Sequence, residues 1–251
     1  MNEYIFVIII RILSAIMVGT YIGMFFVQAR VQRSMYVFGQ VFAKSGVTAS
    51  TMVREILRRA EIDDVSVIYS GDIGVTDHFD PEKNHIALSQ SIYNSSSVSA
   101  LGIAAHEVAH AIQRKQKYGF YVFREKLAPV VEFGSRISIP IILIGLIVRL
   151  LFSTSSVGVY IMLVGLGCFL LYSLFMLVTL PVELNASKRA LNLLGSTGIL
   201  DEEELLGAEE VLKAAAATYV YAFFMSFLNG FRYALSKQRQ DDDDKNDKDK
   251  K

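Results

Sequence analysis

The sequence is poor in the features that mark disulfide-rich and nucleic-acid-binding proteins. Its 251 residues include one cysteine and four histidines, and 25 lysines and arginines are balanced by 25 aspartates and glutamates. The single cysteine, Cys168, excludes an intrachain disulfide framework and a zinc site built from thiolates. A formal net charge of zero argues against a large basic surface, so no nucleic-acid partner is expected.

Apolar residues, in contrast, are abundant. They make up 52% of the sequence, and the mean hydropathy of +0.37 is high for a soluble protein. Three apolar regions predict four transmembrane helices: residues 1–29, a hairpin of two helices at 137–181 that turns near 153–156, and residues 216–236. Glu3 stands where a secretion signal carries basic residues, and the first apolar run is too long for a signal, which favours a permanent span.

One short motif carries recognisable chemistry. His106, Glu107 and His110 have the spacing His-Glu-x-x-His, and residues four apart on an α-helix lie on one face. Both imidazoles can therefore reach one metal ion, while Glu107 lies beside it as a candidate general base. Zn²⁺ is the expected metal, because it lowers the pKa of bound water from about 15.7 to about 7 and so supplies a nucleophile at neutral pH. We interpret the motif as a zinc hydrolase site.

The neighbouring residues favour a helix at the motif. A serine from the run at 96–99 can cap the first amides of the alanine-rich stretch that follows. The basic run at 113–117 complements the negative end of a helix dipole, and Gly119 offers a stop. The alternative is a chance match on an amphipathic helix, which roughly one chain of this length in a few hundred would contain.

The motif lies in a region of ordinary globular composition, residues 30–136, which we interpret as the catalytic domain. Residues 51–61 predict an amphipathic helix, and residues 65–69 and 85–89 predict two β-strands joined by a turn-rich loop at 71–84. Two strands followed by the motif helix indicate a small α+β core. If the second strand is a sheet edge beside the metal, its unpaired amides could bind an extended peptide as a further strand.

A catalytic zinc site needs a third protein ligand and an open fourth position. The candidates are the remaining imidazoles and carboxylates of the globular region, together with one acid after the apolar hairpin: His78, His85, Asp77, Asp80, Glu125, Glu132 and Glu183. Glu183 is favoured, because a hairpin returns the chain to the side of the membrane that it left, and Ala186 and Ala190 allow a close approach between helices. The alternative is that Glu183 is an interfacial acid at a helix N-terminus, stabilised by the helix dipole.

Four motifs in this order resemble the YugP-type family of membrane zinc metallopeptidases: TDHFDP at 76–81, Leu88-Ser89 with Tyr93-Asn94, AAHEVAHAIQ at 104–113, and LPVELNASKRA at 180–190. The similarity covers nearly the whole chain outside its charged tail. More distantly, the chain is similar to the HtpX-type membrane proteases, whose third zinc ligand is a glutamate in a late helix.

The resemblance implies a ligand set and a fold. By it, Glu183 completes the zinc site with His106 and His110. The implied architecture is an α-helical multi-pass membrane protein with an α+β zincin-like (gluzincin) metalloprotease domain. The chain departs from the family at one position, because members usually carry an aspartate where this chain has Asn185. If that side chain orients a ligand histidine, an amide oxygen raises the basicity of the imidazole less than a carboxylate does, so zinc affinity or rate is expected to be lower.

The loop Asp77-His78-Phe79-Asp80-Pro81 allows two interpretations. In the first, the imidazole of His78 lies near the zinc and donates a hydrogen bond to the oxyanion of the transition state. In the second, Asp80 forms an Asx-turn before Pro81, and the loop has a structural role.

These features predict a membrane-embedded zinc-dependent endopeptidase that hydrolyses peptides or membrane and membrane-associated proteins, in quality control or processing. Residues 182–215 are expected to be a helical segment with the third ligand, and 237–251 a disordered charged tail. Basic residues cluster between the first two spans, so we expect a cell-membrane protein with its catalytic domain on the cytoplasmic side. A homo-oligomer or a membrane partner protein is compatible with the sequence.

Two other functions fit the same residues. One is an intramembrane protease whose motif helix lies inside a span, although the basic run after the motif favours a site at the membrane surface. The other is a catalytically inactive membrane scaffold or assembly factor with a structural zinc. A fourth protein ligand would indicate the scaffold, because catalysis needs an open coordination position.

Overall fold

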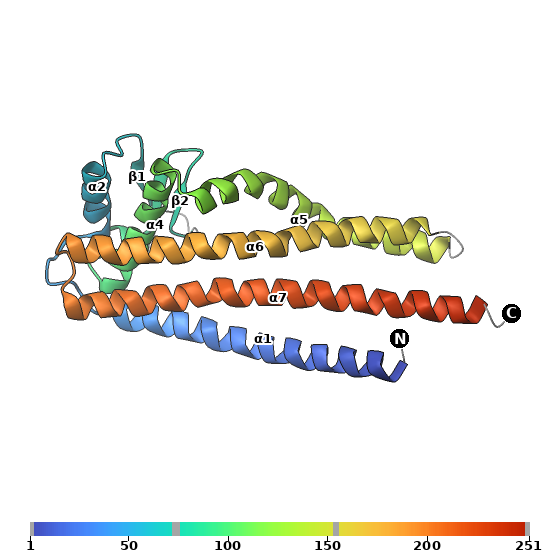
Figure 1. Ribbon diagram of the computed structural model, residues 1–251. Helices are drawn as coiled ribbons and strands as arrows, with labels where there is room; N and C mark the ends of the chain where they lie inside the picture. Colours follow the sequence, from blue (N-terminus) through green and yellow to red (C-terminus); the bar gives the residue numbers. More distant parts are fainter. Residues whose placement is uncertain (1–2, 72–75, 153–155, 249–251) are drawn as a thin grey trace. The chain divides into compact units, whose positions relative to one another are not determined.

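The computed structural model of the chain describes residues 3–71, 76–152 and 156–248. Within these residues, seven helices and three strands follow one another (Figure 1): α1 Glu3–Gly39, α2 Ala49–Arg59, β1 Ser66–Ser70, β2 His78–Asp80, β3 His85–Ser89, α3 Gln90–Tyr93, α4 Val98–Lys115, α5 Gly119–Leu151, α6 Val157–Ser196 and α7 Glu202–Lys248. Part of the predicted loop at 71–84 and most of the predicted hairpin turn at 153–156 lie outside the described residues.

The chain divides into two compact units. One, the globular unit, consists of Phe26–Phe123 and Thr179–Thr218, and it contains the sheet and helices α2, α3 and α4. The other, the helical unit, consists of Met1–Phe25, Arg124–Val178 and Tyr219–Lys251. Helices α1, α5, α6 and α7 each contribute residues to both units.

Four helices are long and apolar enough to cross a membrane, as the sequence predicts. The candidate spans lie in α1, α5, α6 and α7, at Ser14–Gly39, Gly119–Leu151, Val157–Ser196 and Glu202–Leu228. Helix α4, which carries the histidine motif, is not among the candidates found in the described residues. The chain is therefore a largely helical membrane protein with a small sheet.

The long helices extend beyond the predicted spans. Gly119 is the first residue of α5 rather than a stop for α4, which ends at Lys115 and is followed by Lys117 with a φ of 50°. Pro140 and Pro181 lie inside α5 and α6, because a proline removes only one helical hydrogen bond and a long helix can continue past it.

Helix α7 includes most of the charged tail at 237–251, whose disorder stays a prediction. The backbone of α7 is helical as far as Lys248, and residues 249–251 lie outside the described part. After residue 230 the sequence contains no glycine or proline that would end the helix.

In the helical unit, α5 and α6 pack with their backbones close together. A Cβ atom added to Gly165 would lie 2.6 Å from Cγ1 of Ile142 and 2.9 Å from the carbonyl oxygen of Ser138. The hydroxyl oxygens of Ser173 on α6 and Ser226 on α7 are 2.5 Å apart and buried. Small residues and interhelical hydroxyl bonds are typical of transmembrane helix contacts.

The sheet of the globular unit has the strand order β1-β3-β2. Strands β1 and β3 are parallel, and they match the two predicted strands to within one residue. Strand β2 is antiparallel to β3 and occupies an edge. The sequence did not predict β2, which is three residues long and lies in the segment interpreted as loop. The predicted second strand, β3, is therefore central and cannot present a free edge to a peptide.

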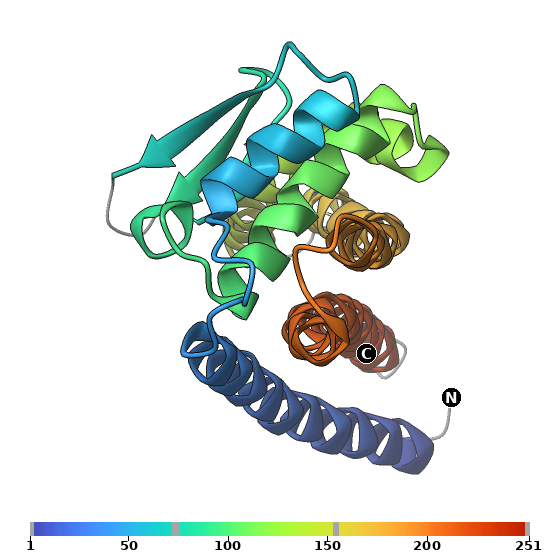
Figure 2. The same ribbon diagram turned by 90° about the vertical axis from the view of Figure 1, so that its left-hand side faces the viewer.

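Helices α2 and α4 lie side by side next to the sheet (Figure 2). Their shared core is made of apolar side chains that are almost fully buried: Met52, Val53 and Ile56 from α2, Ile86 and Leu88 from β3, and Leu101, Ala104, Ala105 and Val108 from α4. The same cluster includes Val182, Ala190 and Leu194 of α6. This core fixes the helix that carries the histidine motif.

Two helix starts of this unit are capped by side chains, and the first is the predicted serine cap. The hydroxyl of Ser97 accepts a hydrogen bond from the Ala100 N–H at the start of α4. Before α7, the Glu204 N–H donates to the Asp201 carboxylate at 2.9 Å and the Asp201 N–H donates to the Glu204 carboxylate at 3.0 Å, which is a capping box. The backbone N–H of Lys44 donates to Glu204 and its ammonium group donates to Asp201, so the cap connects α7 to the segment after α1.

Candidate metal centre

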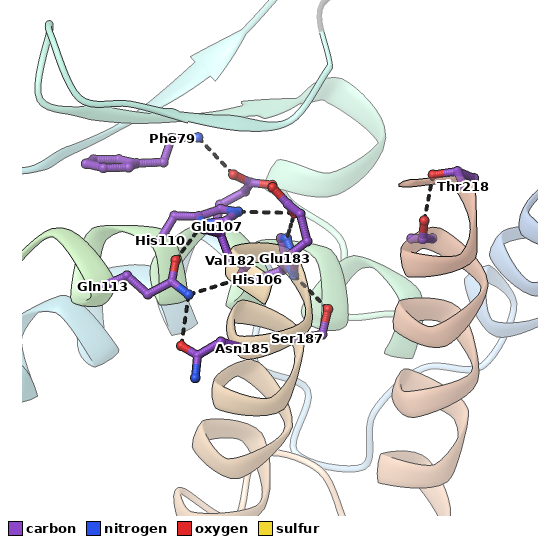
Figure 3. A network of polar contacts seen from close by, with 11 residues as sticks. Phe79, His106, Glu107, His110, Gln113, Val182, Glu183, Asn185, Ser187 and Thr218 are labelled. Carbon is purple, nitrogen blue, oxygen red and sulfur yellow. Dashed lines mark hydrogen bonds and ion pairs between the residues drawn. The ribbon is translucent and has the colours of Figure 1, made fainter. Parts of the chain in front are cut away.

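Two histidines and one glutamate converge in the globular unit. Nε2 of His106 lies 3.0 Å from Oε2 of Glu183, and Nε2 of His110 lies 3.5 Å from the same oxygen (Figure 3). All three ligand atoms lie within 4.8 Å of one another. The side chains of His110 and Glu183 are almost fully buried, with exposed fractions of 8% and 2% for the residues. The structure thus brings together the three residues that the sequence favours as ligands.

Helix α6 places Glu183 against α4. The residues at 182, 186, 190 and 194 form one stripe of this helix, and Val182, Ala186, Ala190 and Leu194 are all fully buried. Small side chains at 186 and 190 allow the close approach that the sequence suggests. Because α6 begins at Val157, Glu183 is deep inside the helix, and the alternative of an N-terminal dipole acid is wrong.

The donor set fits zinc. Two imidazole nitrogens and one carboxylate oxygen are the three protein ligands of His₂Glu catalytic zinc sites, and hard cations such as Mg²⁺ prefer oxygen ligands alone. Within the described residues, this group contains three donors, which leaves the fourth position of a tetrahedral ion for water or substrate.

A buried glutamine holds His110. Nδ1 of His110 lies 3.0 Å from Oε1 of Gln113, and the Gln113 amide nitrogen donates to the Val182 carbonyl and to Oδ1 of Asn185, both at 2.9 Å. Gln113 is fully buried. A ring that donates from Nδ1 keeps its lone pair on Nε2, the nitrogen that faces Glu183.

His106 has a separate partner on α6. Its Nδ1 lies 3.3 Å from the hydroxyl of Ser187, one helical turn after Glu183. Asn185, which the family resemblance suggested as a direct partner of a ligand histidine, instead contacts Gln113 and so reaches His110 through an intermediate side chain. The effect of replacing the family's aspartate at this position is therefore expected to be indirect.

Glu107 follows His106 on α4 and is held by the backbone of β2. Its Oε2 accepts a hydrogen bond from the backbone N–H of Phe79 on β2, at 2.9 Å. Removal from water raises the pKa of this carboxyl to about 7, although the charge of His106 and the Phe79 hydrogen bond act in the opposite direction. A carboxyl with a pKa near neutrality can both accept and release a proton under physiological conditions.

The structure does not bring His78 into the group around Glu183. His78 belongs to a second set of potential ligands with Asp80 and His85, and its Nδ1 lies 2.7 Å from the Thr76 carbonyl. Its role as an oxyanion donor stays an untested prediction. Asp80 accepts a hydrogen bond from the Glu82 N–H at 2.9 Å, which confirms the Asx-turn.

The other candidate acids also have different partners. Asp77 accepts hydrogen bonds from the backbone N–H and the hydroxyl of Ser89, at 2.7 and 3.2 Å. Glu132 lies in the helical unit and pairs with Arg136, while Glu125 belongs to the same unit. Neither Asp77, Glu125 nor Glu132 belongs to a three-donor group in the part of the chain that the structure describes.

Sequence reasoning missed three supports of the site: Gln113, Ser187 and the backbone of Phe79. Two of these had a signal in their spacing. Gln113 follows His110 by three residues, and Ser187 follows Glu183 by four, so each shares a helix face with a ligand. The Phe79 contact depends on the short strand β2, for which the sequence shows no clear alternation.

Two imidazoles and a carboxylate are a donor set for zinc, and four helices are candidate membrane spans. Comparison with known proteins agrees with both features. The family model described as "Putative neutral zinc metallopeptidase" matches residues 12–238, and the chain belongs to this family. The chain is also 36% identical over 216 residues to the "Putative membrane protease YugP" of Bacillus subtilis (strain 168), covering 84% of this chain and 90% of that protein. No solved structure matches the chain at a significant level.

Proposed function

We propose that the chain is a membrane-embedded, zinc-dependent endopeptidase whose metal ligands are His106, His110 and Glu183. The observation that carries the proposal is the convergence of two imidazole nitrogens on one carboxylate oxygen, at 3.0 and 3.5 Å. Glu107 belongs to the same helix turn as His106 and is fixed by the N–H of Phe79. In this proposal the globular unit is a gluzincin domain, in which a glutamate from a later helix is the third ligand.

The residues divide the chemistry between them. Zinc in such a site supplies Lewis acidity, which polarises a water molecule and the carbonyl group of the scissile bond. Glu107 takes a proton from the attacking water and delivers it to the leaving amine. Its pKa of about 7 suits both transfers, because the carboxyl is neither a strong acid nor permanently protonated at neutral pH.

The edge strand β2 offers a binding position for an extended peptide. Phe79 pairs with Ile86 of β3, and its N–H points away from β3 toward Glu107. In an antiparallel strand the N–H and C=O of one residue face the same side, so the Phe79 carbonyl also faces away from β3. A substrate backbone N–H can donate to this carbonyl, which would align a peptide beside Glu107.

The membrane helices suggest the substrates and the location. A catalytic unit that is attached to four membrane-spanning helices is close to membrane and membrane-associated proteins, so we propose these proteins as substrates. Their cleavage would serve protein quality control or processing. The basic residues between the first two spans favour the cytoplasmic side for the globular unit. The alternative, an inactive scaffold with a structural zinc, requires a fourth protein ligand, whereas the described group has three.

The proposal is tested with Glu107→Gln in the full-length protein. Glutamine retains an oxygen that can accept the Phe79 hydrogen bond, so the zinc content is expected to match that of the wild type. Cleavage of a misfolded membrane protein is expected to fall at least about 100-fold, because the general base is absent. Glu203→Gln, an exposed acid at the start of α7, is the matched control and should cleave normally. An unchanged rate in Glu107→Gln overturns the mechanism, and a wild type that binds zinc without cleaving supports the scaffold.

A further inference from the structure

A second group of potential metal ligands lies in the globular unit, outside the site with Glu183. It consists of His78 and Asp80 on β2 and His85 on β3, whose ligand atoms all lie within 4.8 Å of one another. All three residues are partly exposed, so an ion could reach them from solvent. The group shares no residue with the first set of ligands.

The register of the sheet explains why these side chains meet. Side chains alternate along a strand, so His78 and Asp80 share one face of β2, while the buried Phe79 faces the core on the other. Asp80 is directly opposite His85 in the antiparallel pair. The rings of His78 and His85 have their centroids 6.1 Å apart. Backbone pairing therefore places two imidazoles and one carboxylate on the same face of the sheet.

Hydrogen bonds orient the donor atoms of two of these residues. Nδ1 of His78 lies 2.7 Å from the carbonyl oxygen of Thr76, and because a carbonyl can only accept, Nδ1 carries the proton and Nε2 keeps its lone pair. A metal-ligating histidine typically donates its other N–H in this way. Oδ1 of Asp80 accepts the N–H groups of Glu82 and Lys83, at 2.9 and 3.0 Å.

The second oxygen of Asp80 is the one available to an ion. Oδ2 lies 3.6 Å from Nζ of Lys83, whose side chain is 73% exposed. An exposed ion pair of this length contributes little, so a divalent cation can displace the ammonium. Bonds of about 2.0–2.1 Å to a tetrahedral zinc ion place two ligand atoms about 3.3 Å apart, which rotations of the partly exposed side chains can reach.

We propose that His78, Asp80 and His85 form a second binding site for a divalent transition-metal ion of the zinc type. Imidazole nitrogens favour zinc over Mg²⁺ and Ca²⁺, which prefer oxygen ligands alone. The site joins β2 to β3. Because the N–H of Phe79 on β2 holds Glu107, an ion at this position also stabilises the strand that orients Glu107. Binding itself does not depend on the proposed peptidase activity.

The test counts metal ions in the full-length protein purified in detergent, stripped with a chelator and titrated with Zn²⁺. The wild type is expected to bind two ions per chain. Asp80→Asn is expected to bind one, because the amide oxygen can still accept the N–H groups of Glu82 and Lys83 while the carboxylate ligand is lost. His85→Ala is also expected to bind one. The remaining ion shows that these variants are folded.

Two further variants separate the sites. Glu183→Gln is expected to keep one ion, and the double variant Glu183→Gln/Asp80→Asn none. Glu82→Gln, which removes a neighbouring negative charge but no ligand, should bind two ions like the wild type. The second site is overturned if the wild type binds only one ion and Glu183→Gln binds none. It is also overturned if Asp80→Asn and His85→Ala both still bind two ions. Failure of the peptidase proposal alone would leave the ion at the second site in place.

Discussion

Nε of Arg189 donates a hydrogen bond to Oδ1 of Asn185 across 2.7 Å. A guanidinium group can only donate, so this Asn185 atom is the oxygen, and the Gln113 atom 2.9 Å from it is the amide nitrogen. The other end of Gln113 is then its oxygen, which accepts the proton on Nδ1 of His110. One positive charge on α6 therefore sets the direction of a series of hydrogen bonds that ends with a lone pair on Nε2 of His110.

Removing the middle of this series should weaken metal binding. Gln113→Leu leaves the Nδ1–H of His110 and the Val182 carbonyl without their partner in a buried position. The zinc affinity is expected to fall about 10- to 100-fold, as it does when the partner of a ligand histidine is lost. Competition with a chelator of known affinity measures the change. Gln116→Ala is the control. Gln116 is exposed and accepts a hydrogen bond from Nη1 of Arg189, whereas Arg189 binds Asn185 through Nε, so the loss of Gln116 should leave affinity unchanged.

Aspartate at position 185, which the family resemblance leads us to expect there, should preserve the series. In Asn185→Asp, a carboxylate oxygen accepts from both Arg189 and Gln113, so no hydrogen bond changes direction. The added negative charge is next to Arg189 and acts on His110 only through Gln113. We expect a zinc affinity equal to that of the wild type or up to about tenfold higher, by the same competition assay. Weaker binding in Asn185→Asp would show that Asn185 does not act through its side-chain oxygen.

The rate of cleavage should decrease as the pH falls. The base form of Glu107 is the charged carboxylate, and burial raises its pKa to about 7. A bound dication favours the charged form, so the acid limb of the rate is expected at or below pH 7, with the rate constant above it. The check is kcat/KM against pH, with zinc content measured at each point to separate protonation of the base from loss of metal. A rate that is constant or increases from about pH 7 to pH 5 with zinc retained would contradict the assignment.

Close packing in the helical unit predicts a difference between two glycines of α6. A Cβ on Gly165 would lie 2.6 Å from Ile142, whereas a Cβ on Gly167 would meet nothing within 4 Å. Gly165→Ala is expected to destabilise the protein by about 1–3 kcal/mol through overpacking. Gly167→Ala is expected to be neutral, or stabilising by up to about 1 kcal/mol, because alanine has the higher helix propensity. Thermal unfolding in detergent compares the two, and equal midpoints would contradict the close approach of α5 and α6.

The features predicted best from the sequence are those with a local or periodic signal. Strands β1 and β3 and the serine cap of α4 follow from patterns a few residues long. The same holds for the position of the two motif histidines on one helix. Glu183 is different, because 77 residues separate it from His106, and only the hairpin geometry and the family resemblance point to it.

The supports of the site could not be predicted in the same way. Strand β2 is three residues long, and its place at the edge depends on pairing with β3 rather than on its own sequence. The orientation of Gln113 depends on Arg189 and Asn185, which lie on another helix. The predicted hairpin at 137–181 covers only part of α5 and α6, because it follows the apolar runs, whereas both helices continue into more polar sequence.

Helix α6 is continuous from Val157 to Ser196, so one helix contains both Glu183 and a candidate membrane span. A water-soluble fragment that ends before α6 would retain His106 and His110 but would lack the Glu183 carboxylate, the third proposed ligand. No contiguous piece of the chain can therefore hold the whole centre without also carrying hydrophobic membrane sequence. Biochemical work on this protein has to begin from the intact chain in detergent or lipid.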